Sequence, residues 1–319
     1  MTGAHPLLAL GWDDARAAEL AALGDDRLVA ARVTRTDRGV ITVWRERGVD
    51  VRATTATAAK HTVAGDWVAM DPDTRRAEVL LERRTAFVRR AARGAHRGQV
   101  LAANLDVAVI VQGLEPGVQL RRLERELLLA YESGARPEVV LTKSDLVPDA
   151  DAQVAQARSV APGVTVTVCS PHTGQGIEDV RARLGSRTTV AFLGASGVGK
   201  STLINALAGN QALRTGEVRH GDHKGRHTTT AAELVELDGE RFIIDTPGVR
   251  ALALWTTDRG LDLAFPEITE AAERCRFDDC RHGREPDCAV LEGVELGTID
   301  RDRFDHWLLL REEIEALDT

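Results

Sequence analysis

Residues 194–202 read Gly-Ala-Ser-Gly-Val-Gly-Lys-Ser-Thr, a glycine-rich turn that ends in a lysine and two hydroxyl side chains. A turn of this kind binds phosphate when a strand precedes it and a helix follows, because its backbone N–H groups then face the anion at the helix N-terminus. Both neighbours are present, since residues 188–193 are β-branched and apolar and residues 202–207 show a helical pattern. We therefore expect a phosphate site formed by Gly194, Ala195, Ser196, Gly197, Val198, Gly199, Lys200, Ser201 and Thr202.

Two side chains of this turn have the chemistry of phosphoryl transfer. The ammonium group of Lys200 is expected to reach the β- and γ-phosphate oxygens and so to act in catalysis. The hydroxyl group of Ser201 is expected to bind the Mg²⁺ ion that accompanies the nucleotide.

A second polar motif, at residues 142–145, indicates that the base is guanine. It follows the apolar run 138–141, and open α/β sheets bind ligands at the carboxyl ends of their strands. Asp145 can accept two hydrogen bonds from guanine N1 and N2, a donor pair that adenine lacks. Thr142 stands where asparagine is commoner, and the loss of the amide predicts weaker bracing of the loop. The expected base-binding set is Thr142, Lys143, Ser144, Asp145 and, from a separate Cys-Ser-Pro motif, Ser170.

A third motif, Asp-Thr-Pro-Gly at residues 245–248, predicts a switch. It follows the strand pattern 241–244, so its loop lies at the same edge of a sheet. Asp245 is expected to hold Mg²⁺ through a water molecule, and the N–H group of Gly248 is expected to bind the γ-phosphate. Loss of that phosphate would then release the loop.

The polar, glycine-containing residues 216–230 predict a second mobile segment that closes on Mg²⁺. We expect Thr229 to be the magnesium ligand, with Thr228 as the alternative. Many GTPases place a water-orienting glutamine after the glycine of the third motif, but this chain has Val249, which can neither donate nor accept a hydrogen bond. His227 is therefore predicted to orient the attacking water, with a solvated loop histidine as the alternative.

The order of these motifs predicts the topology of the domain that carries them. The phosphate loop comes first in an ordinary G domain, yet here both base-reading motifs precede it. The sequence therefore predicts a circularly permuted α/β domain. Its strands are expected at 105–111, 139–141, 164–168, 190–193, 233–237 and 242–244, with a helix at 120–132.

Three of the four cysteines and one histidine lie close together near the C-terminus. The spacing is Cys275-x4-Cys280-x-His282-x5-Cys288, and the intervening residues are too polar to form a core. These four ligands suit a closed tetrahedral Zn²⁺ site that stabilises its own fold, with one ion per chain. A redox role or unrelated cysteines are the alternatives. Cys169 is instead expected to be a buried strand residue.

The N-terminal part shows five short strand patterns, at 28–34, 40–44, 49–53, 66–70 and 77–82, separated by turn residues. Five strands of this length form a small barrel, either an OB-fold or an SH3-like barrel. Residues 83–105 follow without any acidic residue, which predicts contact with RNA phosphates; a solvated linker is the alternative. Phe87 is the only aromatic residue in this stretch that could stack on a base, so contact with the RNA backbone is expected to outweigh readout of the base sequence. The basic residues are Arg83, Arg84, Arg89, Arg90, Arg93, His96 and Arg97.

The motif order, the His-Thr-Thr-Thr segment 227–230, the Asp-Thr-Pro-Gly-Val-Arg segment 245–250 and the Cys/His cluster resemble the bacterial small ribosomal subunit biogenesis GTPase family, RsgA or YjeQ. The resemblance implies an N-terminal extension (1–27), an OB-fold RNA-binding domain (28–90), a permuted G domain (91–260) and a zinc-binding domain (261–319). It also implies late assembly of the small (30S) ribosomal subunit, with binding to its rRNA and with GTP hydrolysis that the subunit stimulates.

Composition sets limits on these expectations. The chain has 319 residues, 43% of them hydrophobic, and no apolar run long enough to span a membrane. The net charge of −8 lies in residues 268–319, so the rest of the chain is balanced and RNA binding is not excluded. The first residues do not resemble a signal peptide, which predicts a cytoplasmic protein, and we expect a monomer. A nucleotide kinase and a non-catalytic, GTP-dependent RNA-binding module are the alternative functions.

Overall fold

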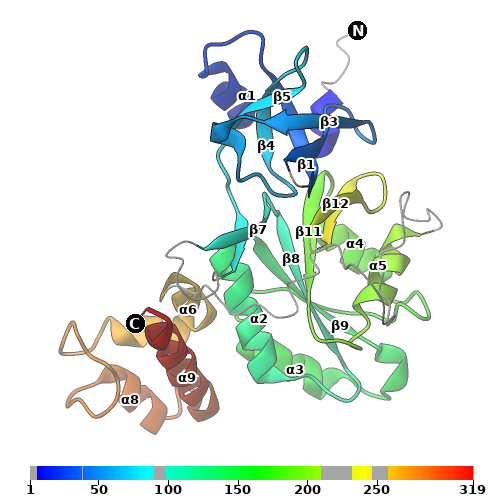
Figure 1. Ribbon diagram of the computed structural model, residues 1–319. Helices are drawn as coiled ribbons and strands as arrows, with labels where there is room; N and C mark the ends of the chain where they lie inside the picture. Colours follow the sequence, from blue (N-terminus) through cyan, green and yellow to red (C-terminus); the bar gives the residue numbers. More distant parts are fainter. Residues whose placement is uncertain (1–5, 38, 90–97, 210–231, 246–257, 319) are drawn as a thin grey trace, which may run out of the picture.

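The computed structural model describes residues 6–37, 39–89, 98–209, 232–245 and 258–318. An N-terminal barrel, a central α/β domain and a helical C-terminal domain follow one another along the chain (Figure 1). The N-terminal elements are η1 (Pro6–Leu10), α1 (Asp14–Ala21), β1 (Val29–Asp37), β2 (Val40–Trp44), β3 (Asp50–Thr55), η2 (Thr57–Ala59), β4 (Trp67–Asp71) and β5 (Arg76–Leu80).

The central domain begins with a hairpin, β6 (Ala86–Arg89) and β7 (Gln99–Ala103). Its main elements are β8 (Val107–Gly113), α2 (Leu120–Ser133), β9 (Arg136–Thr142), η3 (Ser144–Leu146), α3 (Asp151–Val160), β10 (Val166–Val168), α4 (Ile177–Leu184), β11 (Thr188–Leu193), α5 (Lys200–Ala208), β12 (Glu233–Glu236) and β13 (Arg241–Asp245). The C-terminal domain contains α6 (Asp258–Ala264), α7 (Pro266–Ala272), α8 (Ala289–Glu295) and α9 (Arg301–Asp318).

The five N-terminal strands close into an OB-type barrel. They follow the order β1-β2-β3-β5-β4, and β4 pairs with β1 to complete the circle. The pairing of β3 with β5 is parallel, whereas the other pairings in the barrel are antiparallel. This order, with one parallel closure, distinguishes the OB-fold from an SH3-like barrel and confirms the predicted strands.

The central sheet has the order β10-β9-β8-β11-β13-β12, with β12 as its antiparallel strand. All six predicted strands are present. Every residue of β8 is buried, as expected for a strand that lies in the middle of a parallel sheet and is covered on both faces. Strands β8, β9 and β10, which come first in the chain among the strands of this sheet, lie on one side of β11, and β13 and β12 lie on the other. The sheet therefore brings the base-reading and phosphate-binding loops to one edge in spite of their reversed order.

The barrel and the central sheet are joined side by side. Strand β12 pairs with β1 of the barrel through Arg35 and Glu233, so that both sheets form one continuous ladder. Trp44 of the barrel packs edge-on against Phe242 of β13, with ring centroids 5.9 Å apart. One hydrophobic core cluster includes residues of both domains. The barrel is thus packed onto the central domain as well as connected to it by the chain.

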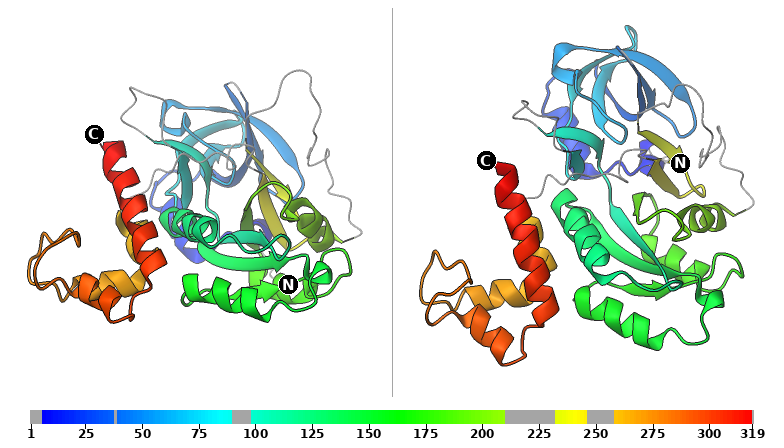
Figure 2. Two further views of the ribbon diagram at one scale, coloured as in Figure 1. Left: turned by 90° about the horizontal axis from the view of Figure 1, so that it is seen from below. Right: turned by 60° about the horizontal axis from the view of Figure 1, so that its bottom comes forward.

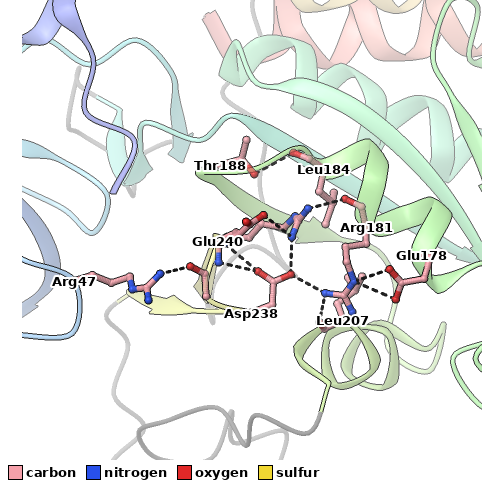
Figure 3. A network of polar contacts seen from close by, with 10 residues as sticks. Arg47, Glu178, Arg181, Leu184, Thr188, Leu207, Asp238 and Glu240 are labelled. Carbon is pink, nitrogen blue, oxygen red and sulfur yellow. Dashed lines mark hydrogen bonds and ion pairs between the residues drawn. The ribbon is translucent and has the colours of Figure 1, made fainter. Parts of the chain in front are cut away.

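A network of arginines holds the hairpin between β12 and β13 (Figure 3). The carboxylate of Asp238 accepts hydrogen bonds from Arg181 of α4 and from Arg241 of β13, each at 2.7 Å. Arg181 also donates to the carbonyl of Leu207, near the end of α5, at 2.7 Å. The barrel joins the same hairpin because Arg47 pairs with Glu236. These contacts fix the strand that directly follows residues 210–231.

The hairpin β6–β7 changes the interpretation of the arginine-rich stretch. Phe87 is 2% exposed and belongs to the core, so it is not available to stack on a base. Arg83 forms a salt bridge with buried Asp66 at 2.7 Å, and Arg84 pairs with Asp13. These two arginines therefore have carboxylate partners that are distant in the sequence. Arg89 donates a hydrogen bond to the side chain of Gln99. Residues 90–97, which include Arg90, Arg93 and Arg97, lie outside the described residues.

The N-terminal segment packs into the junction between barrel and sheet. Leu7, Leu10 and Trp12 are buried, and the ring of Trp12 lies 4.8 Å from that of Trp67. Helix α1 begins at a capping aspartate, whose side chain accepts the N–H group of Arg16 at 2.9 Å. This segment contributes to the shared core and not only to the surface.

The C-terminal domain packs on helix α2 of the central domain (Figure 2). Its own core gathers residues such as Phe265, Phe304 and Trp307. The carboxylate of Glu124, on α2, is 2% exposed and accepts hydrogen bonds from Arg303 at 2.8 Å and from His306. A buried ion pair with this geometry fixes the orientation of two packed elements. Within the described residues, no helix is both long and apolar enough to cross a membrane.

Candidate guanine-nucleotide and metal sites

The phosphate loop connects β11 to α5, as the sequence predicts. Gly194 lies against β8, and a Cβ atom there would come within 2.4 Å of the carbonyl oxygen of Val111. Gly199 has a φ of +94°, which side-chain-bearing residues rarely adopt. The ammonium group of Lys200 donates to the carbonyls of Gly194, at 2.7 Å, and Ala195. Ala195, Ser196, Gly197 and Val198 form the rest of the turn, and Ser201 and Thr202 follow in the first turn of α5.

The hydroxyl group of Thr142 joins the base-reading loop to the phosphate loop. It is fully buried, donates to the carbonyl of Val198, and lies 3.3 Å from the carbonyl of Gln112. Gly199 completes the contact, because a Cβ atom at that position would lie 3.1 Å from the same hydroxyl oxygen. Threonine therefore braces the phosphate loop through its hydroxyl group, although it lacks the amide of asparagine.

The base-reading residues lie at the ends of β9 and β10. The hydroxyl of Ser170 donates to the carboxylate of Asp145 at 2.5 Å and lowers the pKa of that carboxyl group. Asp145 is thereby held ionised and oriented, as an acceptor for two guanine N–H groups must be. Lys143 has a left-handed backbone, and its ammonium group donates to the carbonyl of Glu115 at 3.0 Å. The N–H group of Ser144 donates to the carbonyl of Cys169 at 3.3 Å, which ties the two base-reading motifs together.

For the predicted magnesium-binding, γ-phosphate-binding and water-orienting residues, the structure gives no side-chain contacts. His227, Thr229 and Gly248 lie outside the described residues, as does the alternative ligand Thr228. Asp245 is the last residue of β13, and its backbone lies opposite Glu233 of β12. The described part of the nucleotide site therefore contains the whole phosphate loop and the base-reading loop.

Sequence analysis did not identify Gln112 or Glu115 as parts of this site. Both lie in or next to the turn between β8 and α2, and they touch the site through backbone carbonyls. Because every residue has a backbone carbonyl group, such a contact cannot be predicted from the residue type. The one available signal was the polar Gln112 at the end of an otherwise apolar strand.

The predicted metal ligands Cys275, Cys280, His282 and Cys288 form one cluster, with all ligand atoms within 4.8 Å of one another. The Sγ atoms of Cys275 and Cys288 are 3.9 Å apart, and the Nδ1 atom of His282 lies 3.3 Å from the latter. Ligands around a tetrahedral Zn²⁺ ion are separated by about 3.8 Å, given Zn–S bonds of about 2.3 Å. The cluster therefore fits a zinc ion and could hold one.

The protonation chemistry of the cluster also favours a metal. Burial, reinforced by the charge of Arg311, lowers the pKa of His282 and so favours the neutral imidazole that a metal requires. Burial opposes ionisation of Cys275, but the N–H groups of Val290 and Ala289 and the neighbouring thiols outweigh it and lower its pKa. Burial raises the pKa of Cys280 to about 11. The thiols cannot all ionise easily without a cation between them. Cys169 lies elsewhere and is fully buried, and burial raises its pKa to about 12.

Comparison with known proteins decides the family. A profile of the RsgA GTPase family matches residues 80–255. A relative from Streptomyces avermitilis, named small ribosomal subunit biogenesis GTPase RsgA, is 44% identical over 322 aligned positions, which cover 98% of this chain and 86% of the relative. The chain belongs to the RsgA GTPase family. A protein of the same name from Streptomyces coelicolor is also 44% identical and covers 98% of this chain and 87% of its own length.

Solved structures of RsgA-type proteins share the fold. YjeQ from Thermotoga maritima superposes with a TM-score of 0.70 at 25% identity, covering 90% of this chain and 98% of that one. YloQ, described as a circularly permuted GTPase, gives a TM-score of 0.67 at 22% identity, covering 91% and 96%. The chain thus has the permuted G-domain fold with an N-terminal OB-type barrel. As a member of the RsgA GTPase family it is a GTP-hydrolysing enzyme, and the family implies the use of Mg²⁺.

Proposed function

We propose that this RsgA-family GTPase acts as a late assembly factor for the small (30S) ribosomal subunit. Its site would bind GTP, hydrolyse it to GDP, and respond to the subunit by faster turnover. The relatives from both Streptomyces species are named small ribosomal subunit biogenesis GTPase RsgA, which supports this proposal. The observation that carries the nucleotide part is the contact between Thr142 and Val198, because it unites a guanine-reading loop and a phosphate loop in one site.

We further propose roles for the individual residues of that site. Asp145, oriented by Ser170, would read guanine, with Lys143 along the base and Ser144 in the same loop. The turn from Gly194 to Thr202 would cradle the phosphates, with Lys200 stabilising the charge that develops on them. Ser201 and Thr229 would bind Mg²⁺, with Asp245 acting through water. Gly248 would bind the γ-phosphate, and His227 would orient the attacking water.

The proposed division of the chain keeps the boundaries expected from the sequence, although β6 (Ala86–Arg89) belongs to the central domain and α6 of the C-terminal domain already begins at Asp258. The barrel (28–90) would contact rRNA, the G domain (91–260) would bind nucleotide, and the C-terminal domain (261–319) would hold one structural Zn²⁺ ion. The arginines that remain candidates for rRNA phosphates are Arg89, Arg90, Arg93 and Arg97, because Arg83 and Arg84 have carboxylate partners. We also propose that the protein is a monomer and that it acts in the cytoplasm.

The decisive experiment measures GTP turnover by the pure protein with purified small subunits added or omitted. We expect slow turnover alone, because Val249 replaces the usual water-orienting glutamine, and clear stimulation by the small subunit. Large subunits are the matched control for added ribosomal RNA and protein. The variant Lys200→Ala controls for contaminating hydrolases. Equal turnover with small subunits, with large subunits and without either would refute the proposed partner.

A further inference from the structure

A buried carboxylate lies behind the nucleotide site, on helix α2. Glu126 is 6% exposed. Its two oxygens accept hydrogen bonds from the side chains of Gln112, at 2.7 Å, and Arg122, at 2.9 Å. Burying a carboxylate is costly unless it is paired and hydrogen-bonded, and both oxygens of Glu126 meet this requirement.

The partner Gln112 connects this carboxylate to the base-reading loop. Gln112 is the penultimate residue of β8 and is 1% exposed. Its side-chain NH₂ group donates a hydrogen bond to Glu126, and its side-chain oxygen accepts one from the backbone N–H group of Gln119 at 3.4 Å. The side chain therefore spans the turn 113–119, closing it from one end to the other. That turn presents the carbonyl of Glu115 to the ammonium group of Lys143.

The same residue supports the phosphate loop. The backbone carbonyl of Gln112 lies 3.3 Å from the hydroxyl of Thr142, which in turn braces Val198. The preceding carbonyl, of Val111, lies against Gly194. Glu126 also lines a cavity of about 440 Å³ together with Leu193 and Gly194. The end of β8 is thus the common support of both nucleotide-binding loops.

The groups around Glu126 act on its pKa in opposite directions. Burial raises its pKa, whereas Arg122, Gln112 and Lys200 favour its ionised form. The ionised carboxylate accepts the amide of Gln112 through a charge-assisted hydrogen bond, which is shorter and stronger than a neutral one.

We propose that Glu126 is a positioning residue for guanine-nucleotide binding, acting through Gln112 on Lys143, Thr142 and the start of the phosphate loop. Glu126 does not touch the nucleotide. It fixes the turn on which the base-reading and phosphate loops both rest, so its effect is on affinity and not on the chemical step. This inference rests on the nucleotide site proposed above.

The test compares full-length Glu126→Gln with the wild-type protein by GTP and GDP affinity and by steady-state hydrolysis. Replacing the charged acceptor by a neutral amide is expected to raise Kd for both nucleotides, and KM for GTP, about tenfold. Turnover at saturating GTP is expected to stay within about twofold, because a group that acts only on binding changes KM and leaves kcat. The matched control is Glu132→Gln, on the same helix but facing Gly260 of α6, for which no change in affinity is expected.

A second variant keeps the test decisive if Glu126→Gln does not fold. Gln112→Met removes the link and leaves the pair of Glu126 with Arg122, and it too must raise Kd. In the double variant the increase is expected to be smaller than the product of the two single increases, because both residues act in one hydrogen-bonded chain. Unchanged Kd in Gln112→Met, or a fall in kcat with unchanged KM, overturns the inference. A wild-type protein that does not prefer guanine over adenine nucleotides overturns the nucleotide site itself, which is a separate outcome.

Discussion

The four possible metal ligands come from residues 275–288, whereas the proposed nucleotide-binding residues that the structure describes are spread between residues 142 and 245. The metal cluster sits among short helices and loops, and its ligands are neighbours in the chain. The nucleotide site stands at one edge of a sheet whose strands are far apart in the sequence. A local site of this kind depends on its ion, and a site built from distant loops depends on the packing of the strands beneath it.

The largest effect is expected from removing a metal ligand, which should disrupt the zinc site and leave nucleotide binding nearly unchanged. In Cys288→Ser, loss of a ligand from the cluster is expected to abolish zinc binding, and structural zinc sites contribute on the order of 10 kcal/mol to folding. The C-terminal domain should unfold, which exposes Trp307 and shifts its fluorescence. Zinc content, fluorescence and GDP affinity measured on one preparation check this. A parallel loss of GDP affinity would show that the nucleotide site depends on the metal.

The reverse experiment removes the charge of the phosphate loop. Lys200→Ala is expected to lower GTP turnover by roughly 100-fold or more, since the ammonium group stabilises the charge that develops on the phosphates. Its zinc content should equal that of the wild-type protein. Hydrolysis rates at saturating nucleotide, with metal analysis as the control, decide the outcome. Unimpaired turnover would exclude this loop from catalysis.

A smaller change tests the brace between the two loops. Thr142→Val keeps the shape of the side chain but removes the hydroxyl that reaches Val198. Loss of one such hydrogen bond costs about 1 kcal/mol, so GDP affinity is expected to fall roughly fivefold. Thr142→Asn should restore most of the affinity, because the amide can make an equivalent contact. Calorimetric titration of both variants measures this, and equal affinities of the valine and threonine proteins would argue against a brace.

The smallest expected effect is a shift in pH dependence. Ser170 lowers the pKa of Asp145, so the carboxylate stays ionised, and guanine binding persists, until the pH falls through that lowered pKa. In Ser170→Ala the pKa returns towards its ordinary value, and affinity for GDP should begin to fall at a higher pH. At neutral pH the two proteins should differ little in this respect. Titrations across the acidic range, with ADP as a control for general acid effects, make the comparison.

The local motifs of both sites could be predicted from the sequence. The spacing of Cys275, Cys280, His282 and Cys288 is enough to indicate a metal cluster, because the ligands are held together by short stretches of chain. The phosphate loop and Asp145 could likewise be predicted, since their motifs follow strand patterns that the structure contains. The six strands of the sheet and the five of the barrel are all near their predicted positions.

What the sequence could not supply are contacts between distant residues. The arginines at 83 and 84 suggested a phosphate surface because their carboxylate partners, Asp66 and Asp13, belong to other segments. The strand pattern of β6 and β7 was hidden by the basic residues around it, so the burial of Phe87 in the core could not be predicted. The link between Glu126 and Gln112 was also invisible, since residue type alone does not show which side chains meet across elements.

The position of β8 has a consequence for synthesis of the protein. This strand is apolar and buried along its whole length, and β11 covers one of its edges. A ribosome making the chain releases β8 and its other neighbour β9 well before residues 188–193 exist. During that interval an apolar strand edge is open to pairing with other chains. Nascent chains stopped shortly before residue 188 should therefore aggregate or recruit chaperones, whereas those that extend past β11 should not.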